Sequence, residues 1–199
     1  MERVSFDVER GATFGILGGS GSGKTTLLRC LIGLEEPSDG VIDIDGIGAP
    51  HTYEGVPRYG VLPQFGALFN SMTLVENLAL PLATWTSVRG HAMREVIQAK
   101  LDLVGLGAFA EHRPSEISGV MKRRAGIARA LVLDPELLFL DEPSAGLDPI
   151  SAAELDQLVV TIGRDFGITT VLVTQEFPST LLTVNASIVL DPATTGIAA

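Results

Sequence analysis

The sequence predicts an α/β fold, in which short apolar strands alternate with amphipathic helices around a mixed sheet. Two observations lead to this prediction. Short apolar runs, such as residues 12–17 and 137–140, are bounded by glycine or by acidic residues, as buried strands are. Longer stretches, such as residues 25–32 and 151–166, place apolar residues at helical spacing. With 199 residues, of which 46% are hydrophobic, the chain can bury the core of one domain with a subdomain.

The first predicted elements are a strand, a glycine-rich loop and a helix. The strand covers residues 12–17, and Gly18 and Gly19 end it before the helix over residues 25–32 begins. Residues 41–45 alternate apolar and acidic side chains, which predicts an antiparallel strand with one face in water. A small antiparallel β portion is therefore expected beside the main sheet.

A helical insertion is predicted from residue 73 to residue 104, because the apolar spacing there changes to that of helices. Leu74, Leu78 and Leu82 share one face of its first helix. The other elements follow from apolar runs and turn residues in the same way. They are strands at residues 59–62, 137–140, 168–173 and 188–190, helices at residues 118–133 and 151–166, and a frayed tail at residues 192–196.

The charge of the chain limits which anions it can hold. Its 14 basic and 24 acidic residues give a net charge of −10, which excludes a general positive field for nucleic acid or an anionic lipid surface. We therefore expect no nucleic-acid partner, and any bound anion must be held by a local arrangement of donors. Because no apolar stretch approaches the roughly 20 residues of a membrane span, and the first residues contain no apolar signal segment, we expect neither a membrane span nor a signal peptide.

A phosphate-binding loop is predicted between the first strand and its helix. Residues 18–25 read GGSGSGKT, which fits the pattern GxxxxGK followed by serine or threonine. Glycines let successive backbone N–H groups face one anion, and the helix N-terminus adds its positive end. In such a loop Lys24 neutralises the β- and γ-phosphates, and the Thr25 hydroxyl binds Mg²⁺. The nucleotide-binding candidates are Gly18, Gly19, Ser20, Gly21, Ser22, Gly23, Lys24, Thr25 and Thr26.

Two carboxylates follow the apolar strand at residues 137–140. A buried strand of an α/β sheet places its last residues at the carboxyl edge, where ligands bind. There Asp141 can bind Mg²⁺ directly or through water, and Glu142 can polarise an attacking water as a general base. The alternative is that both acids cap the turn at Pro143. By themselves, these two motifs allow many nucleoside triphosphatases or a small-molecule kinase.

A third motif narrows the choice to one family. Residues 117–131 start with Ser118 and Gly119, which cap a predicted amphipathic helix. This segment resembles the signature motif of the nucleotide-binding ATPase of ABC transporters, although Val120 stands where that family usually has a second glycine. The resemblance implies that the helix start meets the γ-phosphate held by a second subunit. The alternative is an ordinary helix cap with a solvated basic face at Lys122, Arg123 and Arg124.

Three further residues resemble landmarks of the family. Gln64 resembles the glutamine that touches Mg²⁺, and Asp148 resembles the contact across the subunit interface. Gln175 stands where the family places a histidine that senses the γ-phosphate, and its amide can donate a hydrogen bond but cannot act as an imidazole. The resemblance thus implies ATP and Mg²⁺ as cofactors. It implies catalytic roles for Lys24, Glu142 and Gln175, Mg²⁺ contacts from Thr25, Gln64 and Asp141, and cross-subunit contacts from Ser118, Gly119 and Asp148.

The resemblance covers nearly the whole chain as one ABC ATPase domain. It divides residues 1–199 into a phosphate-loop and β part (1–70), a helical subdomain (71–118) and the remaining core (119–199). Within the family, residues 65–82, 121–124 and 146–151 look like the Mla-type lipid transport ATPases. That likeness implies an ATP-hydrolysing homodimer on the cytoplasmic face of the inner membrane, which drives two permeases and moves lipid. The permease contact is expected at residues 66–90.

The chain also departs from the family pattern. The family's first strand and its adenine-stacking aromatic are expected upstream of Met1, since Phe6 is too close to the phosphate loop to be that aromatic, and the carboxyl end comes early, soon after Asp191. Together with Val120 and Gln175, these departures leave three interpretations open, which are a shortened gene model, a fragment and a degenerate subunit. The alternative function is a hydrolysis-impaired module that dimerises with ATP.

Overall fold

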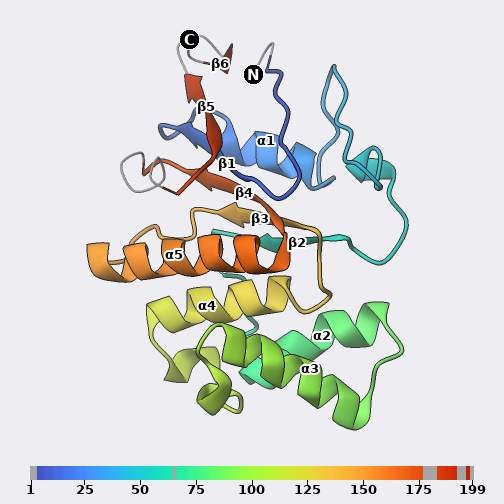
Figure 1. Ribbon diagram of the computed structural model, residues 1–199, viewed down its shortest axis with the longest axis vertical. Coiled ribbons are helices and arrows are strands. Elements are labelled where there is room, and N and C mark those ends of the chain that lie inside the picture. The colour runs from blue at the N-terminus through green and yellow to red at the C-terminus, as the bar shows by residue number, and fades with distance from the viewer. Residues whose placement is uncertain (1–3, 65, 177–182, 192–195, 198–199) are drawn as a thin grey trace.

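A sheet with helices on both faces forms the upper part of the molecule in Figure 1, and two further helices lie beyond one edge of the sheet. The α/β class predicted from the sequence is confirmed. The computed structural model describes every residue except 1–3, 65, 177–182, 192–195 and 198–199.

Six strands form the sheet in the order β2-β3-β4-β1-β5-β6. The pairings among the strands β1, β2, β3, β4 and β5 are parallel. At the edge of the sheet, β6 pairs antiparallel with β5. Neighbouring parallel strands end at the same edge, so the loops that follow β1, β3 and β4 are brought together there. The strands are β1 (Thr13–Gly18), β2 (Tyr59–Leu62), β3 (Leu137–Asp141), β4 (Thr169–Thr174), β5 (Ala186–Asp191) and β6 (Gly196–Ile197).

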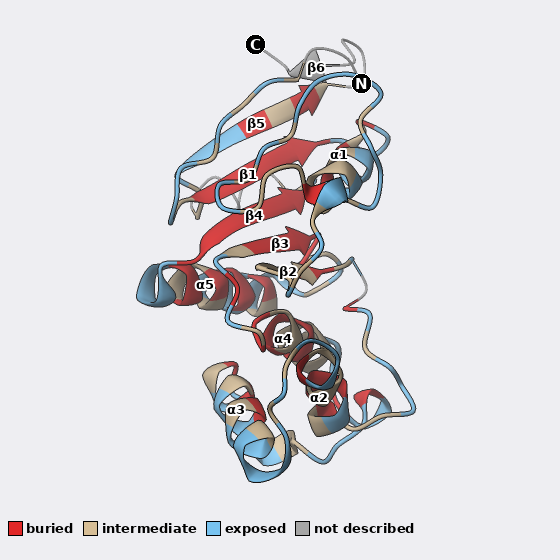
Figure 2. Ribbon diagram, turned by 90° about the vertical axis from the view of Figure 1, so that its right-hand side faces the viewer, coloured by how far each residue is buried: buried red, intermediate tan, exposed pale blue. Residues whose placement is uncertain are grey.

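The two faces of the sheet are packed by different helices because strand side chains alternate. In β3, Leu138 and Leu140 face a core that they share with α5, while Phe139 faces a second core that contains Leu28 of α1. Figure 2 shows the buried residues concentrated in the strands and on the inner sides of the helices. The helices are α1 (Lys24–Leu31), α2 (Leu74–Trp85), α3 (Gly90–Leu103), α4 (Gly119–Ala130) and α5 (Pro149–Phe166).

The helices α2 and α3 pack against α4, at the end of the molecule where β2 forms the edge of the sheet (Figures 1 and 2). Leu74, Leu78 and Leu82, the predicted apolar face of α2, are all buried in the core. This face therefore stabilises the helices themselves and is not open to a partner. Among the described residues, no helix is both long enough and apolar enough to cross a membrane.

The strand predicted at residues 41–45 is wrong. An isolated antiparallel bridge between Ile44 and Gly48 is the β pairing described there. A strand is stable only beside a paired neighbour. Residues 4–8, which lie across a cavity of about 680 Å³ from residues 41–45, run as irregular chain. The alternating pattern therefore indicates a segment that has one side toward this cavity. No strand lies beside this segment in the described part of the chain, so it forms no strand itself.

The frayed tail predicted at residues 192–196 is wrong at its end, because Gly196 pairs with Asp191 as part of β6. Residues 192–195 lie outside the described part of the chain. The backbone N–H and C=O groups at the edge of β5 explain the pairing, since they offer a ladder to any extended segment beside them.

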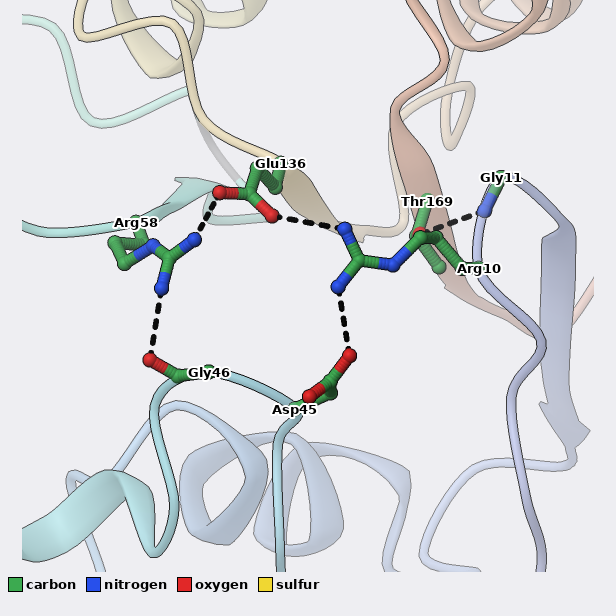
Figure 3. A network of polar contacts seen from close by, with 7 residues as sticks. All are labelled: Arg10, Gly11, Asp45, Gly46, Arg58, Glu136 and Thr169. Atoms are coloured by element: carbon green, nitrogen blue, oxygen red, sulfur yellow. Dashed lines mark hydrogen bonds and ion pairs between the residues drawn. The ribbon is translucent and has the colours of Figure 1, made fainter.

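A polar network holds residues 45–46 against the amino ends of the strands (Figure 3). Arg10 donates to Asp45 at 2.7 Å and to Glu136 at 3.2 Å. Arg58 pairs with the other oxygen of Glu136 and donates to the Gly46 carbonyl at 2.8 Å. Exposed pairs of this kind contribute little stability in water. Their role is to position the segment, which no strand pairing holds.

Candidate nucleotide-binding site

The predicted phosphate loop joins the carboxyl end of β1 to the start of α1. Gly18 leaves no room for a side chain, because an added Cβ would lie 2.5 Å from Ser22 Oγ and 2.7 Å from the Leu190 carbonyl oxygen. Gly21 and Gly23 have φ angles of 79° and 91°, in the left-handed region that glycine adopts without strain. The glycines of the motif therefore serve the tight curl of this loop.

Lys24 is buried in the loop, and its side chain folds back on the loop's own backbone. Its Nζ donates to the carbonyl oxygens of Gly18 at 2.7 Å and Gly19 at 3.0 Å. Ser22 Oγ is also buried, and it has no hydrogen-bond partner among the described residues. An unpartnered buried hydroxyl beside an ammonium group suits an anionic ligand that accepts hydrogen bonds from both.

Asp141 ends β3 at the same edge of the sheet, and it is 7% exposed. Burial, followed by the charge of the adjacent Glu142, raises the pKa of the Asp141 carboxyl above its ordinary value. Lys24 and Arg123 oppose this rise by attracting the charged form. A carboxylate whose charge is disfavoured in this way is suited to a site that receives a cation.

The three residues predicted to contact Mg²⁺ all offer oxygen atoms, which is the donor type that this ion prefers. Thr25 and Gln64 are exposed, whereas Asp141 is buried. In the described part of the chain, no group of three or more His, Cys, Asp or Glu residues could hold a metal ion by itself. This donor set fits Mg²⁺ that arrives with a nucleotide, because Mg²⁺ usually completes its coordination with water and substrate phosphates.

Glu142 has a backbone conformation that few residues other than glycine adopt, with φ of 48°. Its N–H donates to the Val173 carbonyl oxygen at 2.8 Å. Its Oε2 accepts from Thr174 Oγ1 at 3.1 Å and from the Gln175 N–H at 3.3 Å. The end of β4 therefore holds both the backbone and the side chain of Glu142.

Two predicted interface residues cap helices. Ser118 Oγ accepts from the Met121 N–H at 3.3 Å at the start of α4. One carboxylate oxygen of Asp148 accepts from the N–H groups of Ile150 and Ser151 at the start of α5. A hydrogen bond with the Ser151 side chain, followed by these backbone bonds, lowers the pKa of Asp148. Ser118, Gly119 and Asp148 are nevertheless open to solvent, and a Cβ added at Gly119 would meet no atom within 4 Å. A cap and a contact with another molecule are thus compatible at both helix starts.

The fold brings some of the predicted site residues together and leaves others apart. The phosphate loop, Asp141, Glu142 and Gln175 follow β1, β3 and β4, which are neighbours in the sheet, so they share its carboxyl edge. Gln64 follows β2 at the same edge. The side chains of Gln64 and Gln175 are exposed. Ser118 and Gly119 come instead from the start of α4.

Arg123 lies at the site, although the sequence indicates it only as part of a solvated basic face. It is half-buried, so the alternative of a solvated basic face is wrong for this residue. Its Nη2 donates to the Ala145 carbonyl oxygen at 3.3 Å, and its buried Nη1 has no partner among the described residues. Burial lowers the pKa of Arg123, while Asp141 and Glu142 oppose this change. Arg123 therefore links α4 to the loop that follows the two acids.

The sequence family described as ABC transporter matches residues 1–145, which contain the phosphate loop, the signature segment, Asp141 and Glu142. The chain belongs to the ABC transporter family. The recognition of this family from the sequence motifs is therefore confirmed, although residues 146–199 lie outside the matched region.

Two curated relatives of this ABC transporter chain carry different substrate names. A "Probable ribonucleotide transport ATP-binding protein mkl" from Mycobacterium leprae (strain TN) is 45% identical over 178 residues, which are 87% of this chain and 51% of the relative. The "Intermembrane phospholipid transport system ATP-binding protein MlaF" from Escherichia coli (strain K12) is 39% identical over 186 residues, which are 91% of this chain and 69% of the relative. The chain spans about half the length of the first of these relatives.

The fold of this ABC transporter chain is also found in solved structures. The ATP-binding cassette MJ0796, in a dimeric post-hydrolysis state bound to ADP and Pi, superposes with a TM-score of 0.86 at 28% identity. The superposition covers 98% of this chain and 87% of that one. The predicted ABC ATPase type of fold is therefore confirmed, while the roles of individual site residues stay predictions.

Proposed function

We propose that this ABC transporter chain binds ATP with Mg²⁺ and hydrolyses it in a head-to-tail dimer to drive a membrane permease. The observation that carries the proposal is the shared carboxyl edge of the sheet. There the buried Lys24 follows β1, at the end of a loop that suits an anion, and Asp141 and Glu142 lie at the end of β3, the strand next but one to β1. A phosphate-binding cation next to two acids is the arrangement that phosphoryl transfer to water requires.

Each residue has a defined role in this proposal. Lys24 Nζ exchanges the carbonyl oxygens of Gly18 and Gly19 for phosphate oxygens of ATP. Thr25, Gln64 and Asp141 hold Mg²⁺, which supplies neutralising charge at the phosphates when bound.

The chemical step needs a base and a donor near the γ-phosphate. Glu142 accepts a proton from the attacking water, whose oxygen bonds to the γ-phosphorus as the bond to ADP breaks. The exposed Gln175 amide donates to a γ-phosphate oxygen. A neutral amide takes the place of an imidazole here, so this contact does not depend on a histidine's protonation.

Exposed groups at the two helix starts support the dimer. Ser118 and Gly119 are free to approach an ATP held by a second subunit, and Asp148 lies beside Ile150, a large apolar residue that is 74% exposed. An apolar side chain in solvent next to a predicted contact residue gains by burial in an interface. The similar cassette MJ0796 is described as dimeric.

Residues 66–90 are our candidate for the permease contact, with the chain on the cytoplasmic face of the inner membrane. Phe69 and Trp85 are 53% and 45% exposed, and aromatic residues are enriched at protein interfaces. We infer a lipid as substrate from the likeness to MlaF, which is named for phospholipid transport. The name of the mkl relative favours a ribonucleotide instead.

A second candidate function is an ATP-dependent dimerisation module that hydrolyses poorly. Val120 favours it because a side chain stands where the family usually has a second glycine, and Gln175 favours it because it cannot act as an imidazole. In that case Gln175→His would raise turnover. If the wild-type protein hydrolyses ATP at an ordinary rate and Gln175→His leaves that rate unchanged, this candidate function is excluded.

The test of the main proposal is ATP binding and turnover by the purified protein. Lys24→Ala should weaken ATP binding, because a charged hydrogen bond of this kind contributes roughly 1.5–3 kcal/mol. Glu142→Gln should keep ATP binding and lower turnover by about 10²–10⁴-fold. The exposed Glu111 gives a matched control, and Glu111→Gln should leave both unchanged. Unchanged ATP affinity in Lys24→Ala, measured by calorimetry, would overturn the assignment of the phosphate loop.

A further inference from the structure

The carboxylate of Glu142 is held by two donors at the end of β4. Thr174 Oγ1 lies 3.1 Å from Glu142 Oε2, and the Gln175 nitrogen lies 3.3 Å from the same oxygen. Both contacts are on one oxygen of the carboxylate. The other oxygen, Oε1, accepts no hydrogen bond in the described part of the chain, which leaves it to accept a proton. A carboxylate held at one oxygen has a defined orientation.

The hydroxyl of Thr174 can donate its proton in only one direction. The hydroxyl accepts from the Glu176 N–H at 3.0 Å, and the side chain is only 2% exposed. A hydroxyl has a single proton, and this proton goes to Glu142 Oε2. Thr174 therefore fixes the position of Glu142 relative to the backbone of residues 175–176.

The contact from residue 175 does not depend on its side chain. The donor to Glu142 is the main-chain N–H of Gln175, while the Gln175 side chain is exposed. Any residue other than proline at this position can supply that N–H. A glutamine where the family places a histidine thus leaves both donors to Glu142 intact.

We propose that Thr174 is a positioning residue, which orients Glu142 as the base for ATP hydrolysis and does so independently of the side chain at position 175. This inference rests on the proposed function, in which Glu142 takes the proton of the attacking water, and it assigns that proton to Oε1. The water oxygen bonds to the γ-phosphorus while the bond between this phosphorus and the bridging oxygen of ADP breaks. Thr174 touches none of the reacting atoms.

The test compares Thr174→Val with Thr174→Ser in steady-state ATP hydrolysis. Valine keeps the shape of threonine and removes the hydroxyl, so kcat should fall by about 10–100-fold, the scale of a small misplacement of a reacting group. KM for ATP should stay within about 2-fold of wild type, because Thr174 is not a ligand of ATP in this proposal. Serine keeps the hydroxyl and should restore most of kcat.

Thr170 offers a matched control on the same strand. It is fully buried, and its Oγ1 has no hydrogen-bond partner among the described residues. Thr170→Val removes a buried hydroxyl of β4 that makes no hydrogen bond to a carboxylate of the described residues, and it should leave kcat unchanged. In the Glu142→Gln background, Thr174→Val should cause no further loss, since the group that it orients is already disabled.

Each outcome separates this inference from the proposed function. If Thr174→Val turns over ATP like wild type while Glu142→Gln is inactive, the inference is wrong and the proposed function stands. If Thr174→Val loses ATP binding, or if Thr174→Ser does not recover kcat, the hydroxyl does not act through Glu142. Full turnover by Glu142→Gln would overturn the role of Glu142, and with it the inference.

Discussion

The buried charge of Asp141 lowers the stability of the folded protein, although the same carboxylate is predicted to bind Mg²⁺. The pKa of its carboxyl is raised chiefly by burial and by Glu142, and the attraction of Lys24 and Arg123 does not cancel this effect. The folded protein therefore binds a proton at Asp141 more readily than the unfolded chain does. As pH rises from the ordinary pKa of a carboxyl through the raised pKa, stability falls, because the unfolded state gives up its proton first.

We expect Asp141→Asn to be more stable than wild type at pH 7 in the absence of nucleotide, because the variant has no charge to bury. The gain in melting temperature should shrink as pH is lowered toward the ordinary pKa of aspartate, where wild type is protonated too. Thermal unfolding at several pH values, with the exposed Asp7→Asn as control, measures this. A lower melting temperature for Asp141→Asn at pH 7 would contradict it. Added Mg²⁺ and ATP should stabilise wild type more than the variant.

The start of α2 depends on the buried side chain of Asn77. Its Oδ1 accepts from the Phe69 N–H at 2.8 Å, and its Nδ2 donates to the carbonyl oxygens of Phe69, Met72 and Thr73. Glu76 adds a capping box with Thr73 at the same turn. One amide thus fixes the loop at residues 69–73, which precedes α2 and belongs to the candidate permease contact.

We expect Asn77→Ala to lower the free energy of unfolding by roughly 2–4 kcal/mol, because buried backbone groups lose their partner and each costs about 1–3 kcal/mol. Asn70 provides the comparison, since it is exposed in the same loop. Asn70→Ala should change the free energy by less than about 0.5 kcal/mol, as surface substitutions usually do. Urea unfolding gives both values. Equal effects of the two substitutions would show that the amide of Asn77 does not hold this loop.

Val120 is the residue whose substitution tests the proposed dimer. Val120 lies in the first turn of α4 beside the exposed Ser118 and Gly119, and its φ is not positive. Its own chain therefore has no backbone requirement for glycine at this position. Any benefit of glycine must come from the closer approach of a second subunit.

We expect Val120→Gly, in the Glu142→Gln background, to strengthen ATP-driven dimerisation while slightly lowering the stability of the monomer. Glycine costs a few tenths of a kcal/mol relative to valine inside a helix. Light scattering after size exclusion with ATP and Mg²⁺ measures the dimer, and thermal unfolding without nucleotide measures the monomer. Lys24→Ala in the same background should remain monomeric. Weaker dimerisation of Val120→Gly would contradict the proposed approach of the signature helix to the second subunit.

The strands and helices of the sheet were predictable because their signals are local. The run at residues 59–62 is β2, and the run at residues 137–140 is β3 with Asp141 added. The prediction of a strand at residues 41–45 was wrong because the alternation of apolar and acidic side chains shows only that a strand could form. Whether a partner strand stands beside it is a property of the fold.

The sequence by itself determined the family and the candidate nucleotide residues. Lys24, Asp141 and Glu142 belong to contiguous motifs whose glycine, lysine and carboxylate spacing carries the chemistry directly. Only the tertiary structure decided that Thr174 contacts Glu142 and that Arg123 contacts Ala145 in the loop that follows the two acids. Thr174 is 32 positions and Arg123 is 22 positions from the residue it contacts. Contacts of this kind depend on the order in which strands and helices pack, and no local pattern of side chains encodes that order.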